Sequence, residues 1–189
     1  DWPSLLRICK RLKSLGCSIY GVTPKMMEKF TLNASHLRNL SFAKCLCLTD
    51  ACVMFIAKNL KSLCTLNIRD CPNTSDISLM YLALYAGGRL EMLHADMKKP
   101  ESSSTEQVLI VFSDKCVKLQ ELDLNCGDKQ LCAGRGAALL VRGCPSLSVL
   151  TVNKLSTIGE SARELIQVLR PTLSLLVHEA CLEYDIMAF

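Results

Sequence analysis

The sequence predicts an α/β solenoid, a stack of strand–turn–helix units with a parallel sheet along one side. A Leu-x-x-Leu-x-x pattern, usually apolar at its sixth position, recurs seven times at intervals of about 25 to 29 residues. Nearly every copy is followed by apolar residues at helical spacing, and the copies cover almost the whole chain. One such unit cannot bury its apolar face alone, so the units are expected to stack on one another.

The strand of each unit begins just after the first leucine of the pattern. The seven copies start at Leu12, Leu37, Leu63, Leu90, Leu119, Leu147 and Leu173. Positions 4 and 6 of a copy alternate with polar or variable neighbours, which is the period of a half-buried strand. We therefore expect positions 4 and 6 to face the core and positions 3, 5 and 7 to face outward.

The second half of each unit has the spacing of an amphipathic helix. In the second unit, Thr49 and Asp50 precede apolar residues at Val53, Ile56 and Ala57. A Thr or Ser followed by an acid is typical of a helix N-terminus, where the hydroxyl caps and the carboxylate offsets the helix dipole. Ser75-Asp76 and Thr105-Glu106 give the same signal, and the apolar residues that start at Ala137 and Ala162 repeat the helical spacing.

Composition excludes several classes of protein. Half of the 189 residues are apolar, which is enough for a real core, and the net charge of +4 is too small to indicate nucleic-acid binding. No apolar run is long enough to predict a membrane span. The twelve cysteines lie mostly in apolar runs, as small buried hydrophobes do, which favours the cytoplasm or nucleus, with mitochondrial and ciliary locations left open.

The units resemble the cysteine-containing leucine-rich repeat, with Leu-x-x-Leu-x-Leu-x-x-Cys, then Thr-Asp, then a helix ending near Cys. The cysteines that match are Cys45, Cys71 and Cys181 after the strand and Cys9, Cys116 and Cys144 at the helix end. Lys98 and Leu155 depart from the pattern, and Cys126 is one residue early. The resemblance implies a curved horseshoe segment of about seven repeats, with a parallel concave β-sheet and convex helices. Such repeats occur in F-box ubiquitin ligase receptors and in antagonists of mitotic exit.

The domain organisation follows from the repeats. We expect residues 1–189 to form a single domain. Residues 1–11 would end a preceding repeat, 12–179 would hold the seven repeats, and 180–189 would form a C-terminal cap. The chain is expected to belong to a longer protein. For an F-box protein, the resemblance implies a Skp1-type adaptor bound through a region upstream of these residues.

No catalytic or metal site is predicted, and no cofactor. Cys45-Leu46-Cys47 lacks the second pair of ligands that a zinc site uses. His94 lies near Asp96 and Asp123, but a polar contact on a binding surface explains this group better than a catalytic pair. An enzyme centred on His94 is therefore the weakest of three hypotheses, and a small-molecule ligand in the concave groove stays open.

Candidate binding residues lie at the outward positions of the strands. They are Arg69, Met92, His94, Asp96, Glu121, Asp123, Val149, Leu175 and Val177. The central strands carry a mainly acidic patch, which favours a partner segment with a Lys or Arg. The last two strands expose an apolar cluster, which indicates a contact either with the C-terminal tail or with a partner.

The sequence therefore predicts a non-enzymatic protein–protein interaction module with a protein partner on the concave face. Its more specific form is the substrate-recognition part of an F-box-type (SCF) ubiquitin ligase receptor, which rests on resemblance. The alternative is a structural or assembly subunit of a large ciliary or mitochondrial complex, in which the repeats serve as a scaffold.

Overall fold

A computed structural model describes residues 9–17, 20–96, 104–125, 135–152 and 160–177. Within these ranges a short 3-10 helix, η1 (Cys9–Arg11), precedes six α-helices and seven strands in alternation. The strands are β1 (Ser14–Gly16), β2 (Asn39–Ser41), β3 (Thr65–Ile68), β4 (Met92–Asp96), β5 (Glu121–Asn125), β6 (Val149–Val152) and β7 (Ser174–Val177). The helices are α2 (Pro24–Asn33), α3 (Asp50–Asn59), α4 (Asp76–Ala86), α5 (Ser104–Lys115), α6 (Arg135–Gly143) and α7 (Glu160–Leu169).

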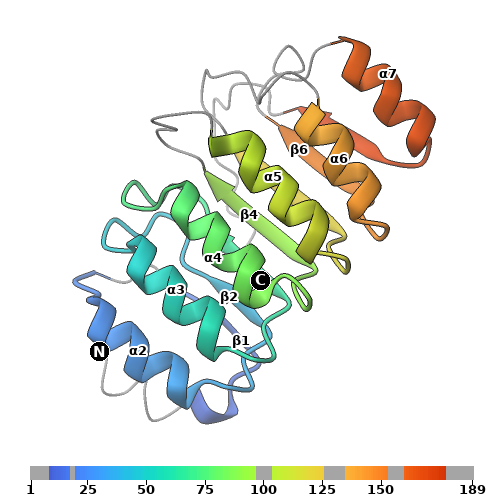
Figure 1. The fold of residues 1–189 in the computed structure, drawn as a ribbon. Coiled ribbons are helices and arrows are strands. Elements are labelled where there is room, and N and C mark those ends of the chain that lie inside the picture. Colours follow the sequence, from blue (N-terminus) through green and yellow to red (C-terminus); the bar gives the residue numbers. More distant parts are fainter. Residues whose placement is uncertain (1–8, 18–19, 97–103, 126–134, 153–159, 178–189) are drawn as a thin grey trace.

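The seven strands form one parallel sheet in chain order, from β1 to β7. From β1 to β6 each strand pairs with the next at the same repeat position, so Leu40 lies beside Leu66 and Leu66 beside Leu93. The helices stack alongside one another on one face of this sheet (Figure 1). The chain is thus a leucine-rich-repeat solenoid, as the sequence predicts.

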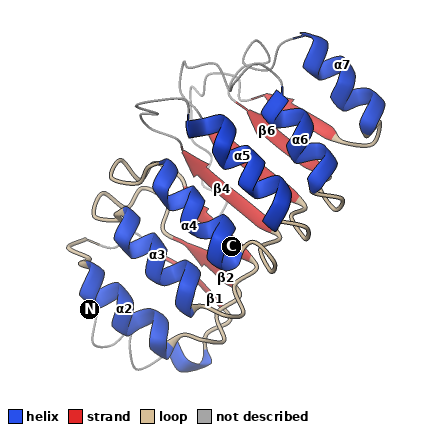
Figure 2. Cartoon of the chain, viewed as in Figure 1, coloured by secondary structure: helices blue, strands red, loops and turns tan. Residues whose placement is uncertain are grey.

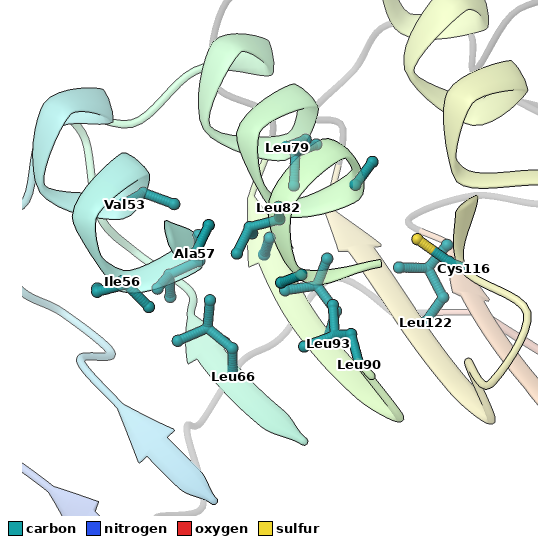
Figure 3. Packing of buried hydrophobic residues seen from close by; sticks show 14 of the residues in the cluster. Val53, Ile56, Ala57, Leu66, Leu79, Leu82, Leu90, Leu93, Cys116 and Leu122 are labelled. Carbon is teal, nitrogen blue, oxygen red and sulfur yellow. The ribbon is translucent and has the colours of Figure 1, made fainter. Parts of the chain in front are cut away.

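A continuous apolar layer fills the space between the sheet and the helices. Leu66 and Leu93 from the strands meet Ile56 and Leu82 from the helices, and all four are fully buried (Figure 3). Each unit contributes a strand leucine at position 4 and helix residues at the spacing expected from the sequence. The core therefore extends from repeat to repeat, and each unit buries its apolar face only against its neighbours.

The register of the last strand differs from the prediction by one residue. Leu175, not Leu176, pairs with Leu150 at the core position, and Leu176 pairs with Thr151. Leu175 is half-buried and packs against the core, whereas Leu176 is 50% exposed. The assignment of Leu175 to the outward face was therefore wrong. Leu175 and Leu176 are adjacent, so either could fill position 4 of the repeat pattern. Pairing with β6 puts Leu175 there.

Two helix starts are capped by a side-chain hydroxyl, at Ser75 as the sequence predicts and at Thr23. The hydroxyls of Thr23 and Ser75 accept hydrogen bonds from the backbone N–H groups of Met26 and Ile77. Thr49 stands at the N-cap position of α3, but its hydroxyl donates instead to the Cys52 sulfur at 3.4 Å.

Asp50 makes a contact that the sequence does not predict. Its carboxylate accepts hydrogen bonds of 2.8 Å from both the backbone N–H and the hydroxyl of Ser75, the N-cap of the next helix. The Ser78 hydroxyl donates to the same carboxylate. An acid placed to offset the dipole of its own helix therefore also ties α3 to α4.

Two arginines join the C-terminus of one helix to the following repeat. Arg89 donates from Nε to the Leu60 carbonyl at 3.1 Å and also reaches the Ala57 carbonyl, both at the end of α3. Arg170 donates to the carbonyls of Val141 and Cys144 at the end of α6. These carbonyls have no partner within their own helix, so a cation in this position satisfies them and the negative end of the helix dipole.

The repeat cysteines pack as buried thiols. Cys71 donates to the Phe42 carbonyl of the preceding repeat at 3.1 Å. Burial raises the pKa of the Cys71 thiol from its ordinary value of 9.0 to about 12, and burial also raises the pKa of Cys116. Because the pKa is higher in the folded chain, thiol burial stabilises the fold fully below about pH 9, and this contribution is lost as the pH rises towards 12.

Several expectations lie outside the described residues. They concern residues 1–8, the cap at 180–189, Lys98, Leu155, Cys126 and Cys181. Among the described residues, no helix is both long and apolar enough to span a bilayer.

Truncation of a core leucine tests the layered packing. We expect Leu93→Ala to lower the free energy of unfolding by about 2 to 5 kcal/mol, because it opens a cavity in a fully buried site. Leu84→Ala, on the exposed side of α4, is the matched control and should cost less than about 1 kcal/mol. Equal losses for the two variants in urea unfolding would contradict this packing.

Thiol reactivity tests the cysteine positions. During brief alkylation at pH 8 the native chain should protect Cys71 and Cys116, which are buried and protonated, while the half-buried Cys64 reacts first. Mass spectrometry of the peptides measures each site, and the guanidinium-unfolded chain supplies the control in which the three react alike. Equal labelling of Cys71 and Cys64 in the native chain would show that Cys71 is not buried.

Candidate binding surface on the concave face

One face of the sheet carries no helix of the described chain. All six helices lie on the opposite side (Figure 2). Parallel sheets are normally covered on both faces, so an open parallel face is a surface that invites a contact. We call this open face the concave face, and define it by the residues at repeat positions 3 and 5 of each strand.

Strand pairing brings the predicted positions together on this face. Met92 pairs with Thr65 and with Glu121, and Glu121 pairs with Val149, in one row across β3 to β6. His94 pairs with Asn67 and Asp123 in the adjacent row. Met92, His94, Glu121 and Val149 are all half-buried, as expected for side chains standing on an open sheet.

Arg69 and Asp123 form an ion pair across the centre of the face. Arg69 follows β3 and Asp123 lies on β5, so the guanidinium reaches over the intervening strand β4. The Asp123 side chain is only 5% exposed and the Arg69 side chain 31%. Asn67 holds the backbone from which the Arg69 side chain extends, because its side-chain oxygen accepts a hydrogen bond from the Arg69 backbone N–H at 3.1 Å.

His94 and Glu121 form the second polar contact. The His94 Nε2 lies 2.8 Å from the Glu121 Oε1, and both side chains remain partly exposed. The sequence places His94 near Asp96 and Asp123, and Asp123 is indeed its cross-strand neighbour; the contact with Glu121 was not predicted. This pair stands at the middle of the concave face, where a partner would meet both groups.

Asp96 lies at the edge of the face and is buried. Its carboxylate accepts a hydrogen bond from the backbone N–H of Asp70, which follows β3. Asp70 has a positive φ of 57°, and Lys44, at the same repeat position one unit earlier, has a φ of 63°. Asp96 therefore holds the turn after β3, and it is not displayed towards a partner as we expected.

These contacts change the electrostatic interpretation of the face. Glu121, Asp123 and Asp96 each have a partner from this chain. The face is therefore less attractive to a partner's Lys or Arg than the sequence predicts. It presents an ordered set of polar groups flanked by the apolar side chains of Met92 and Val149. Such a surface offers shape and hydrogen-bond specificity more than long-range attraction.

On β7, at the far end of the face, the outward residue is one that the sequence analysis did not assign to it. Leu176 occupies the position facing outward beside Thr151 and is half-exposed. Val177 pairs with Val152 at repeat position 6, so its assignment to the outward position 5 was also wrong, by the same shift of one residue. The signal that would have found Leu176 is the pairing with β6, which no single-sequence pattern supplies.

Among the described residues, no group of three or more His, Cys, Asp and Glu side chains is disposed to hold a metal ion. The thiols nearest in the repeat pattern, Cys45 and Cys71, are buried beneath the sheet. The arrangement of His94 and Glu121 can bind through hydrogen bonds.

Comparison with known proteins gives a similarity of fold and none of sequence family. No protein-family model matches the chain, and no curated protein matches it. The chain is similar to a chain in the crystal structure of a Rad7 and Elc1 complex in yeast, with 15% sequence identity and a TM-score of 0.44. The similarity covers 93% of this chain and 63% of that chain, so the chain spans less than two thirds of the length of that protein.

Removal of the Arg69 cation tests the central ion pair. We expect Arg69→Met to destabilise the fold by about 3 kcal/mol, because the almost fully buried Asp123 carboxylate loses its cation. The double variant Arg69→Met/Asp123→Leu should recover most of that loss in urea unfolding, since neither charge then remains. A double variant as unstable as the single one would refute the pairing.

Proposed function

We propose that the chain is a non-enzymatic protein–protein interaction module that binds a segment of another protein on the concave face. The observation that carries this proposal is the open parallel face, which is preformed by seven strands in register. A rigid face needs little ordering on binding, so contacts made by its side chains contribute directly to affinity.

The side chains of the face support a mixed recognition surface. Met92 and Val149 offer apolar anchors in one row, and the His94–Glu121 pair offers a donor and an acceptor between them. A matching partner segment presents an apolar side chain towards Met92 and a polar group towards His94. Anchors of this kind, flanked by ordered polar groups, are typical of interface centres.

The finer proposal concerns the class of partner. We propose that these repeats select substrates for an F-box-type ubiquitin ligase, with a Skp1-type adaptor bound elsewhere in the full-length protein. The support is the resemblance of the repeats to cysteine-containing leucine-rich repeats, in which Cys45 and Cys71 fill the position after the strand. A cytoplasmic or nuclear location belongs to the same proposal.

A second candidate function is a structural role in a large assembly. The observation that favours it is the exposure of apolar side chains on the helices. On α7, Leu165, Val168 and Leu169 are 47%, 77% and 45% exposed, and Leu84 on α4 is 53% exposed. Contacts through the convex side would then hold the complex together, with the sheet as a rigid spacer.

Affinity purification of the full-length protein distinguishes these functions. Co-purification of adaptor and cullin subunits, identified by mass spectrometry, is the result expected for a ligase receptor. The variant Met92→Ala/Val149→Ala should then lose its substrates by more than about tenfold while it keeps adaptor and cullin. A stable set of ciliary or mitochondrial proteins, unchanged by that variant but lost with Leu84→Glu, would overturn the proposal in favour of the structural role.

A further inference from the structure

A second surface lies along the edge of the solenoid where the helices end and the strands begin. A shallow open groove of about 660 Å³ runs along this edge. Six exposed cations line it, namely Lys10, Arg11, Lys13, Arg38, Lys61 and Lys118. They precede four strands, β1, β2, β3 and β5, because each lies just before a strand or in the turn leading to it.

The groove concentrates the positive charge of the molecule. With Arg89, seven cationic side chains line it against one carboxylate, Glu91, which gives a formal net charge of +6. The whole chain carries +4, so the remaining residues are slightly acidic. The positive charge is therefore concentrated at one edge of the solenoid. The small net charge of the whole chain does not reveal this asymmetry.

The six exposed cations are available to a partner. None of them forms an ion pair with another described residue. Arg89 is different, because its guanidinium is committed to the carbonyls at the end of α3. Like charges held side by side repel one another, so an acidic partner would relieve that repulsion as well as attract.

The strand pairing fixes the spacing of these charges. Lys13 and Arg38 immediately precede β1 and β2, and the residues after them pair directly. Neighbouring parallel strands lie about 4.8 Å apart, so the edge from β1 to β5 spans about 19 Å. An extended peptide of about six residues covers that length.

The backbone of the edge favours carboxylates on a peptide over phosphate groups. The N–H groups of Arg38 and Asn39 both donate to the Lys13 carbonyl, at 2.8 and 3.0 Å, and those of Cys64 and Thr65 donate to the Arg38 carbonyl. The same pair of hydrogen bonds to one carbonyl recurs at β4, β5 and β6. These N–H groups are thus used within the sheet, whereas phosphate sites usually rely on free backbone N–H groups at helix N-termini.

The lining also lacks a platform for nucleobases. The described lining holds the imidazole of His36 but no Phe, Tyr or Trp. Single-stranded nucleic acid is normally held by aromatic stacking along with positive charge. Because no such large stacking ring accompanies the cations, and because the N–H groups at the strand starts bond within the sheet, we propose that this basic edge groove, made of Lys10, Arg11, Lys13, Arg38, Lys61 and Lys118, docks an acidic polypeptide segment of a protein partner.

Fluorescence anisotropy with a labelled peptide of alternating Asp and Gly tests this proposal on the full 189-residue chain. We expect saturable binding that weakens as salt is raised and that falls about tenfold or more in Lys13→Glu/Arg38→Glu. The matched control, Lys25→Glu/Lys29→Glu on α2, makes the same charge change away from the groove and should retain binding within about twofold.

Two further measurements keep the outcomes separate. The neutralised variant Lys61→Gln/Lys118→Gln repeats the test without charge reversal, and circular dichroism confirms the fold of each variant. Equal loss in the α2 control, or no loss in either groove variant, would overturn the proposal. Tighter binding of an oligothymidylate of equal charge would overturn it in favour of nucleic acid. Met92→Ala/Val149→Ala should leave peptide binding unchanged, which separates this surface from the concave face.

Discussion

The row of leucines at repeat position 4 is the constraint on which the rest of the structure depends. Leu40, Leu66, Leu93 and Leu122 lie beside one another across adjacent strands and are buried at 2% exposure or less. Because side chains alternate along a strand, burying this row forces positions 3 and 5 to the other face. The burial of that row therefore sets where the open face, its charge pairs and the basic edge lie.

The inter-repeat bonds show how polar groups support this apolar stack. Asp50 links two helix starts, Arg89 links a helix end to the next repeat, and the Cys71 thiol reaches a carbonyl of the repeat before it. Each satisfies backbone or hydroxyl groups at a repeat boundary. The two surfaces differ in consequence: on the concave face the charges of Arg69 and Asp123 are spent on each other, whereas the exposed lysines of the edge remain available.

The fold could be predicted from sequence because it is written as a repeating period. The leucine spacing indicates the strands and the apolar spacing indicates the helices, and among the described strands the register differs from the prediction at β7, where Leu175 and Leu176 allow two alignments. The site could be predicted only as a set of outward positions. The contact of His94 with Glu121 and that of Asp96 with the Asp70 backbone both depend on how far a side chain reaches across the strands. The repeat pattern does not contain that information. The basic groove was missed because its residues are spread from Lys10 to Lys118 in the sequence. They come together when the repeats stack side by side.

Site-specific photo-crosslinking in the full-length protein tests the central claim most directly. A crosslinking amino acid at position 92 samples the concave face, and one at position 84 samples the exposed side of α4. A concave-face binding module predicts that a partner protein is captured from position 92 and much less from position 84. Capture from position 84 alone would contradict the account and make the helices the interaction surface.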